Sequence, residues 1–320
     1  MEDQFLDDFA SGTIDNGKDA ILRLLASCVL GDNQYDILRL RYEDMARNYD
    51  CVTADGKLKR RYINDDSVKV WEFSEGVKPH RRENTQGEYY SDTCSVKIPI
   101  THPFFSQLRK KVISENNYKG AVIGLDLPTW FNLISDKRVM IVAQDPLRDP
   151  TWYHECEEAI CSSPFGLHGR EWRENGRGGR RIALLVEKLI DSGYGVYLTD
   201  AYKFFVRGWT FNEKKADILP LTKDSTAISL YREMLIQEIE IIRPNVIVTL
   251  GKAAGKALDS ILGERGYRIL HMTHFSGSAQ GTLLASSKYA DIKKALGLND
   301  DSVETQASVY AYAIEHSIEI

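Results

Sequence analysis

From residue 138 onward, the sequence alternates short apolar runs with amphipathic stretches. The apolar runs are rich in valine, isoleucine and tyrosine and occupy residues 139–143, 196–199, 246–250 and 268–272. The amphipathic stretches have apolar residues three and four positions apart and occupy residues 181–192, 224–242, 252–262 and 288–296. Apolar strands that alternate with helices are typical of βαβ units. We therefore predict an α/β fold with an open four-stranded parallel sheet flanked by helices.

The first 137 residues have a different pattern. Helix-like periodicity over residues 19–30 and 36–48 precedes a charged middle and a short alternating run at residues 95–100. This mixture is typical of an α+β region. The expected parts of the chain are an N-terminal α+β extension (1–137), an α/β domain (138–298) and a C-terminal tail that can form a helix (299–320).

The composition is that of an ordinary globular protein. The chain has 320 residues, of which 43% are hydrophobic and 27% charged. No apolar run approaches the ~18 residues of a membrane span, and the acidic start, MEDQFLDDFA, lacks the features of a secretory signal. The five cysteines are typical of reduced thiols rather than of a disulfide framework. We expect a cytoplasmic protein with no membrane partner and no obligate protein partner.

The charge distribution leaves the partner open. A net charge of −5 is unusual for a protein that stays on nucleic acid, but basic residues cluster locally. The densest cluster, GREWRENGRGGRR over residues 169–181, includes Arg170, Arg173 and Arg177. A cluster of this kind is usually a solvated face, although it can also contact phosphates.

Chemically active side chains follow the predicted strands. Gln144 and Asp145 follow the first strand, Asp200 and Lys203 follow the second, and His274 follows the fourth. The carboxyl ends of parallel strands meet at one edge of the sheet, where ligands of open α/β sheets bind. We therefore expect these side chains to converge on one pocket at that edge.

Each candidate residue also has a purely structural interpretation. Asp145 can act as a general base or stabilise positive charge, but an aspartate before a proline is most often a cap. His274 can donate a hydrogen bond to a developing anion, and Phe165 can stack on a base. Singly, a histidine or a phenylalanine is more often part of the packing. His271, inside the predicted strand, is the histidine that we expect to be structural.

Together, these segments resemble the uracil-DNA glycosylase superfamily. The family's Gly-Gln-Asp-Pro-Tyr-His segment is similar to Ala-Gln-Asp-Pro-Leu-Arg at residues 143–148, and its base-stacking loop is similar to Pro-Phe-Gly at residues 164–166. The family's strand that ends in Leu-Thr-Asn, with a downstream lysine, is similar to residues 197–203. Its last motif, His-Pro-Ser, is similar to His-Phe-Ser at residues 274–276. The resemblance spans about residues 138–298.

The resemblance implies a DNA glycosylase that flips a nucleotide out of the duplex and hydrolyses its N-glycosidic bond. Asp145 would stabilise the positive charge that develops on the sugar and position water, and His274 would donate to the departing base. The residues expected to contact the flipped base are Gln144, Leu147, Phe165 and Asp200. The residues expected to contact the DNA backbone are Lys203, Ser276, Arg170, Arg173 and Arg177. No cofactor is implied.

Three departures from the family pattern bear on the substrate. Asp200 stands where uracil enzymes have the asparagine that reads the base. A carboxylate accepts a hydrogen bond from the N4 amino group of cytosine, but it opposes the O4 acceptor of uracil. Leu147 replaces the tyrosine that closes the space at C5 of the base, so a substituent can fit there. Phe275 replaces the proline of the last motif, which can redirect its loop.

The sequence therefore predicts removal of a cytosine-like, 5-modified base, such as hydroxymethylcytosine or its glucosylated form in phage DNA, in a defence against phages. Removal of ordinary cytosine would destroy the host genome. Two alternatives stay open: a conventional uracil repair glycosylase in which Asp200 is protonated, and an inactive module that binds nucleotides or nucleic acid. An iron–sulfur cluster is not expected, because Cys156 and Cys161 lack an accompanying N-terminal Cys-x-x-Cys.

Overall fold

The computed structural model describes residues 16–39, 51–52, 58–59, 81–83, 89–91, 96–115, 120–126, 129–132, 135–144, 159–162, 164–166, 177–209, 215–218, 224–263, 265–275 and 279–318. Within these ranges, no helix combines the length and the apolar character that crossing a membrane requires.

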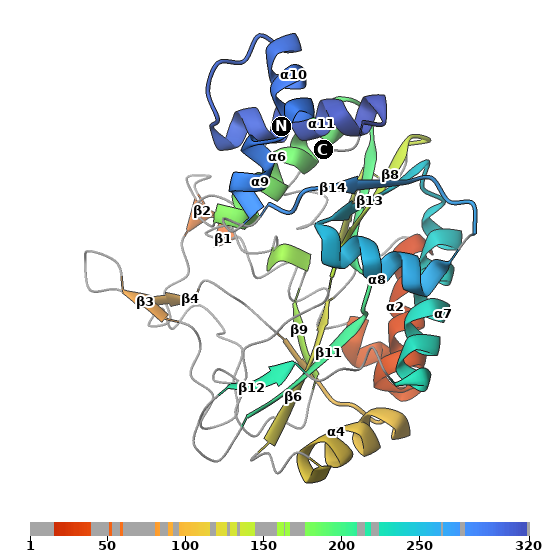
Figure 1. Ribbon diagram of the computed structural model, residues 1–320. Helices are drawn as coiled ribbons and strands as arrows, with labels where there is room; N and C mark the ends of the chain where they lie inside the picture. The colour runs from red at the N-terminus through yellow and green to blue at the C-terminus, as the bar shows by residue number, and fades with distance from the viewer. Residues whose placement is uncertain are drawn as a thin grey trace.

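The central feature is a five-stranded sheet in the order β14-β13-β8-β10-β7 (Figure 1). Its parallel strands are β8 (Arg138–Ala143), β10 (Gly195–Asp200), β13 (Val246–Leu250) and β14 (Ile269–Met272). The predicted four-stranded parallel sheet is therefore confirmed. The structure adds β7 (Thr129–Phe131), which pairs antiparallel with β10 at the edge. Nearly every residue of β8, β10 and β13 is buried, as expected for strands with both faces covered.

Helices cover both faces of this sheet (Figure 1). One face is covered by α6 (Arg177–Asp191), which is backed by α11 (Val303–His316). The other face is covered by α7 (Ser225–Ile242) and α8 (Lys252–Leu262), and α2 (Asn16–Leu25) packs on α7. The arrangement is the doubly covered α/β sheet that the alternating pattern predicts.

Local sequence explains the bounds of α7. Asp224 caps its start, because the carboxylate accepts hydrogen bonds from the backbone N–H groups of Thr226 at 2.9 Å and Ala227 at 3.0 Å. Arg243 ends the helix in the left-handed conformation, and Pro244 follows, which cannot continue it.

A second five-stranded sheet, in the order β12-β11-β6-β9-β5, was not predicted. Its strands are β5 (Val96–Ile98), β6 (Gly120–Asp126), β9 (Ala159–Ser162), β11 (Phe204–Trp209) and β12 (Lys215–Ile218). β6 and β9 run parallel, whereas the other neighbouring pairs are antiparallel. The helix α4 (Pro103–Glu115) packs against β6 and β11.

The division expected at residue 137 does not separate these two sheets. β5 and β6 pair with β9 and β11, and β7 pairs with β10, so strands from both sides of residue 137 share each sheet. Local periodicity marks a strand but not its distant partner, which is why the sequence suggested a separate extension. The other described N-terminal elements are a π-helical turn (Ala26–Leu30), a 3-10 turn (Asp32–Gln34), β1 (Cys51–Val52), β2 (Leu58–Lys59), β3 (Arg81–Glu83) and β4 (Tyr89–Ser91).

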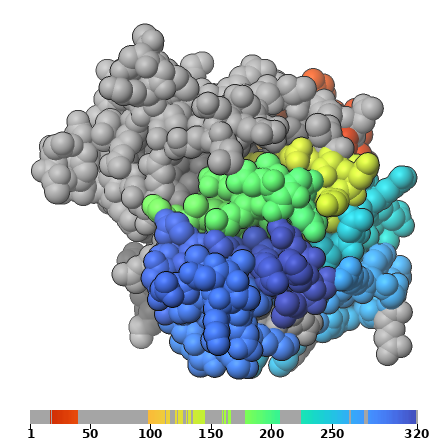
Figure 2. All heavy atoms as spheres, turned by 90° about the horizontal axis from the view of Figure 1, so that it is seen from above, coloured from red at the N-terminus to blue at the C-terminus, as the bar shows by residue number. Residues whose placement is uncertain are grey.

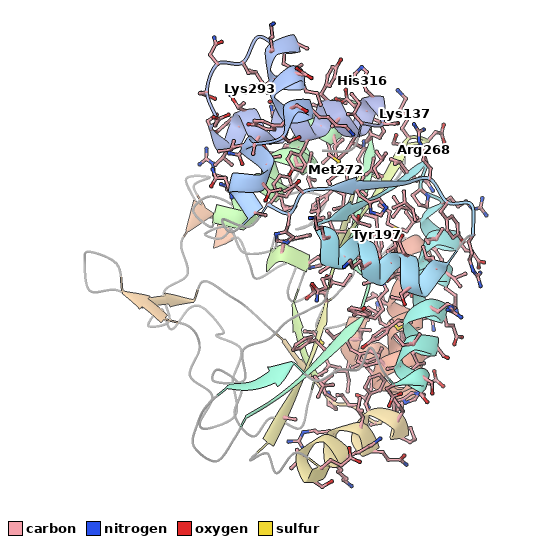
Figure 3. The ribbon with its side chains drawn as sticks, viewed as in Figure 1. Lys137, Tyr197, Arg268, Met272, Lys293 and His316 are labelled. Atoms are coloured by element: carbon pink, nitrogen blue, oxygen red, sulfur yellow. The ribbon has the colours of Figure 1, made fainter. Side chains whose placement is uncertain are left out.

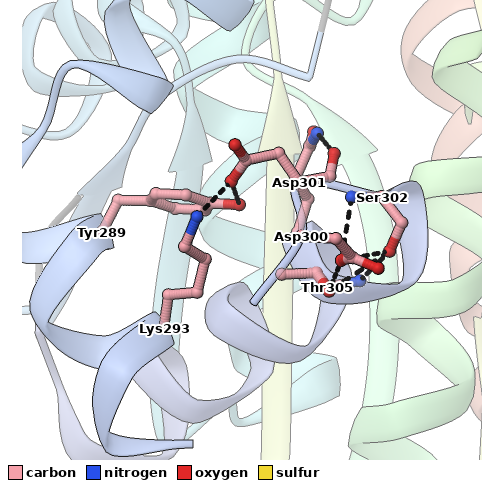
Figure 4. A network of polar contacts seen from close by, with 7 residues as sticks. Tyr289, Lys293, Asp300, Asp301, Ser302 and Thr305 are labelled. Carbon is pink, nitrogen blue, oxygen red and sulfur yellow. Dashed lines mark hydrogen bonds and ion pairs between the residues drawn. The ribbon is translucent and has the colours of Figure 1, made fainter. Parts of the chain in front are cut away.

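The C-terminal residues form α9 (Gln280–Leu284), α10 (Ser287–Ala295) and α11. In the space-filling view, these helices lie against the surface segment that contains α6 (Figure 2). Ser302 caps α11, because its hydroxyl oxygen accepts from the N–H of Thr305 at 3.1 Å. Asp301 accepts from Lys293 of α10 at 2.7 Å (Figure 4). The α10–α11 junction is therefore fixed by a continuous polar network.

Candidate active site

The carboxyl edge of the parallel sheet brings several of the expected site residues together. Asp200 ends β10 and pairs in register with Ala143, which ends β8, and Gln144 follows directly. Gly251 follows β13, and His274 lies two residues beyond the end of β14. The strands that carry Asp200 and His274 are separated by β8 and β13. At about 4.8 Å per strand spacing, the ends of these two strands lie three spacings apart along the same edge of the sheet.

Backbone hydrogen bonds tie neighbouring strand ends together at this edge. The N–H groups of Ala201 and Tyr202 donate to the carbonyl oxygens of Ala143 and Gln144, each at 2.9 Å. The segment after β8 therefore starts from a fixed position. Asp145 follows Gln144 and lies beyond the described residues.

A recess opens beside Asp200, where the two sheets meet. It is lined by Leu25, Asp126, Pro164, Tyr197, Leu198, Thr199, Asp200, Lys203 and Glu238. Tyr197 of β10 lies in the interior of the molecule (Figure 3). Asp126 ends β6 and pairs in register with Ser162, the last residue of β9. Strand ends of both sheets thus reach one small polar recess, and only 4% of Asp200 is exposed.

A buried ion pair lies behind Asp200. The Nζ of Lys203 contacts the carboxylate of Glu238 from α7, and both side chains are 3% exposed. Lys203 also donates to the hydroxyl oxygen of Thr199 at 2.6 Å, and that hydroxyl group donates to Glu238 at 3.1 Å. The ammonium group is therefore committed to two protein partners, and this geometry does not favour the phosphate contact expected of Lys203 from the sequence.

Phe165 lies in a 3-10 turn, Pro164–Gly166, that follows β9. Its backbone has φ 58° and ψ 9°, a left-handed conformation that is uncommon for a bulky residue. The side chain is partly buried against the core, and the neighbouring Pro164 lines the recess. Backbone conformations of this kind occur most often at functional sites, which makes this turn a candidate part of the site.

His274 packs directly against the backbone of Gly251. A Cβ atom at Gly251 would lie 2.9 Å from the Cβ of His274, and the glycine has φ 91°. Burial lowers the pKa of His274 below its ordinary value. The imidazole is therefore neutral at neutral pH and can donate one N–H without carrying charge. His271, by contrast, contacts the hydroxyl group of Thr249 through Nδ1 at 2.9 Å.

A comparison with protein families matches residues 73–296 to the Uracil DNA glycosylase superfamily, which is more than half of the chain. The chain belongs to this superfamily. Its members are DNA glycosylases, so DNA is the partner that membership supports. Among curated proteins, no match was found.

Several residues expected from the superfamily's motifs lie outside the part of the chain that the structure describes. They are Asp145, Leu147, Arg170, Arg173 and Ser276. Arg177 begins α6, and its backbone alone is described. In the described ranges, no group of three or more histidine, cysteine or acidic side chains is arranged to hold a metal ion. Cys161 is fully buried in β9 of this glycosylase-like fold.

Sequence reasoning missed Glu238 and Asp126. The signal for Glu238 was present, because it falls on the apolar face of α7, four residues after the buried Met234 and four before the buried Ile242. A carboxylate at such a position needs a buried partner. Asp126 had no comparable signal, since β6 was not predicted.

Gly251→Ala should displace the His274 side chain and slow base release, in addition to lowering the stability of the fold. The new methyl group would overlap the His274 side chain, and the positive φ adds strain on the order of 1–3 kcal/mol. Gly263→Ala is a matched control, because Gly263 also has a positive φ, 61°, but has no atom within 4 Å of the added Cβ. Thermal unfolding should show a loss in both variants, and base release should fall only in Gly251→Ala. Equal activity in the two variants would contradict the close packing of Gly251 and His274.

Proposed function

We propose that the protein is a DNA glycosylase that removes a cytosine-like base with a substituent at C5, such as hydroxymethylcytosine or its glucosylated form in phage DNA. The product is an abasic site. The observation that carries this proposal is the nearly buried carboxylate of Asp200 at the carboxyl end of β10, in a recess at the junction of two sheets. Members of the superfamily that act on uracil have an asparagine at the matching position of the motif.

The charges around the recess favour a ligand that offers hydrogen-bond donors. Two carboxylates, Asp200 and Glu238, are buried there with one ammonium group, Lys203, and Asp126 lines the same recess. An ionised carboxylate accepts hydrogen bonds and donates none. The N4 amino group of cytosine supplies a donor, whereas the O4 of uracil places an acceptor against acceptors.

In the proposed reaction, one residue acts on the sugar side of the glycosidic bond and another acts on the base side. As the bond between C1′ and the base nitrogen breaks, its electron pair passes to the base, and positive charge develops on the sugar. Asp145 stabilises that positive charge and holds the water whose oxygen bonds to C1′. His274, neutral because of its lowered pKa, donates its N–H to the departing base. The base gains a proton and the water loses one, so no cofactor is needed.

The flipped base needs a surface on which to stack and a protein face that binds the backbone. Phe165 supplies the aromatic ring beside the recess. The proposed phosphate contacts are Arg170 and Arg173, which precede α6, and Arg177, which begins it, and they would make binding depend on salt. A 5-substituent would be accommodated at Leu147, where the uracil enzymes carry a larger tyrosine.

The experiment that tests this function compares oligonucleotides that differ in one base. Duplexes with uracil, cytosine, hydroxymethylcytosine or glucosylated hydroxymethylcytosine are incubated with the protein, and abasic sites are detected by alkaline cleavage. Abasic sites from a modified cytosine alone would support the proposal. Efficient release of uracil with none from any cytosine derivative would sink it and favour a repair glycosylase. No release from any duplex would favour the inactive binding module.

Asp200→Asn should reverse the base preference. The amide N–H can donate to O4 of uracil while the amide oxygen accepts from N3–H, and the amide offers the N4 amino group of cytosine one acceptor fewer. Mismatched polar contacts of this kind can discriminate by roughly 10⁴-fold. Release of the cytosine-like base should therefore fall steeply, and uracil release should become measurable in the same assay.

Two further variants show whether that effect belongs to the recess. Leu147→Tyr should harm bulky 5-substituted bases more than unsubstituted ones, because its effect is steric. Asp191→Asn, at an exposed aspartate that ends α6, should change neither preference. If Asp200→Asn and Asp191→Asn behave alike, Asp200 does not read the base.

A further inference from the structure

Buried side chains from two helices hold the segment that carries His274. The hydroxyl group of Tyr310, from α11, donates to the backbone oxygen of Thr273 at 2.7 Å. Arg181, from α6, donates through Nη1 to the backbone oxygen of Phe275, also at 2.7 Å. These two oxygens belong to the residues directly before and after His274. The backbone on each side of the imidazole is therefore fixed by a separate donor.

Both donating side chains are buried. Tyr310 is fully buried, and Arg181 is 6% exposed. The ring of Phe275 lies against the ring of Tyr310, with the centroids 4.3 Å apart. Burial raises the pKa of Tyr310, so its hydroxyl group keeps its proton at neutral pH and can donate to Thr273.

Contacts along its length fix the position of α11 itself. Arg180 pairs with Glu304 in the first turn of α11. Arg268, which lies directly before β14 (Figure 3), donates to Ser317 at the end of α11. Ser302 caps the start of the helix (Figure 4). The position of Tyr310 relative to the end of β14 follows from these contacts.

An arginine at position 181 is explained by its hydrogen bond and not by packing alone. A guanidinium group is rarely buried, because its removal from water is unfavourable unless hydrogen bonds compensate. A methionine would fill similar space at this position without that electrostatic cost. What the arginine adds is the hydrogen bond to the Phe275 carbonyl, next to His274.

We propose that Arg181 and Tyr310 are positioning residues for His274: they hold its backbone so that the imidazole faces the base at the distance that base release requires. This inference rests on the proposed function, since His274 must serve the reaction for its position to affect the rate. The C-terminal helix is then part of the catalytic machinery of this chain and not only a cover for α6.

The test uses Tyr310→Phe, which keeps the ring against Phe275 and deletes the hydroxyl group. Tyr289→Phe is the matched control, because Tyr289 is also buried in the C-terminal helices, and its hydroxyl group donates to Asp301 at 3.3 Å and not to the segment that carries His274. Both variants should lose a similar amount of thermal stability. Single-turnover base release should fall about 10- to 100-fold in Tyr310→Phe, as expected from a small displacement of a reacting group, and less than twofold in Tyr289→Phe. Binding of the DNA should be unchanged in both.

A second variant separates positioning from stability. Arg181→Met keeps most of the volume and relieves the cost of burying a charge, which offsets part of the loss when the Phe275 carbonyl is left without its donor, so its melting temperature should fall no further than that of Tyr310→Phe. Its rate of base release should nevertheless fall as in Tyr310→Phe. The His274 ring resonances, assigned in proton–carbon NMR spectra with the His274→Gln variant, should shift in Tyr310→Phe and in Arg181→Met but not in Tyr289→Phe.

The NMR measurement makes the two possible failures distinguishable. If the wild type releases no base, the proposed function fails, and the His274 resonances still decide whether Arg181 and Tyr310 position that ring. Unchanged His274 resonances in both variants would overturn the inference. So would base release that falls no further in Tyr310→Phe than in Tyr289→Phe.

Discussion

His274→Ala should slow base release by roughly 10²–10³-fold, the loss expected when one preorganised donor to a developing anion is removed. Asp145→Asn should slow release at least as strongly, because an amide cannot neutralise positive charge on the sugar. Both variants should fold and bind DNA, since the two residues follow strand ends and His274 is only partly buried. Single-turnover kinetics on the preferred duplex, with DNA binding measured separately, would show whether the loss lies in the chemical step.

His271→Ala is the control for the histidine variant. His271 lies in β14 three residues before His274, but its Nδ1 contacts Thr249 and its ring packs beside Gly255. Its removal should leave the rate of base release unchanged. Full activity in both His274→Ala and Asp145→Asn would place the chemistry elsewhere in the chain or show that there is none.

The first sheet was predictable because its strands alternate with helices along the chain, and that order by itself implies a parallel sheet. The runs that became β8, β10 and β13 are almost wholly buried, because helices cover both faces of their sheet, whereas His271 of the edge strand β14 is exposed. The second sheet has an apolar run in β6, at residues 121–125, but nothing in the sequence indicates its partners. β6 pairs with β11, whose residues lie about 80 positions later in the chain, and β5 and β9 contribute only three or four residues each. Periodicity along the chain carries no information about pairing over such separations.

For the site, the sequence predicted only which residues lie at the carboxyl ends of the strands. The rule that ligands bind beyond the carboxyl ends of parallel strands placed Gln144, Asp200 and His274 at one edge, as the structure does. The same rule does not distinguish a basic side chain that faces solvent from one that is buried and bonded to another part of the protein. Lys203 and Arg181 both belong to segments that the sequence assigned to DNA contact, and both are buried. Their partners, Glu238 and the carbonyl of Phe275, are 35 and 94 residues away in the chain.

Glu238→Ala should destabilise the protein by about 3–5 kcal/mol, because it leaves the ammonium group of Lys203 buried without its counter-charge. Lys203→Met should be similarly costly, since the Glu238 carboxylate then lacks its cation. Urea unfolding of each variant measures these losses. Glu304→Ala breaks the exposed pair with Arg180 and is the matched control, with an expected loss below about 1 kcal/mol.

The double variant Lys203→Met/Glu238→Leu tests why the pair is there. A buried ion pair replaced by apolar side chains of similar volume often gives a protein as stable as before, so the double variant should recover most of the stability that each single change loses. It should not recover the proposed preference for a cytosine-like base, because the recess beside Asp200 would have lost the two charges of the Lys203–Glu238 pair. Single substitutions no more costly than Glu304→Ala would mean that the two charges are not buried together. A double variant with full stability and an unchanged preference would mean that the pair serves packing alone.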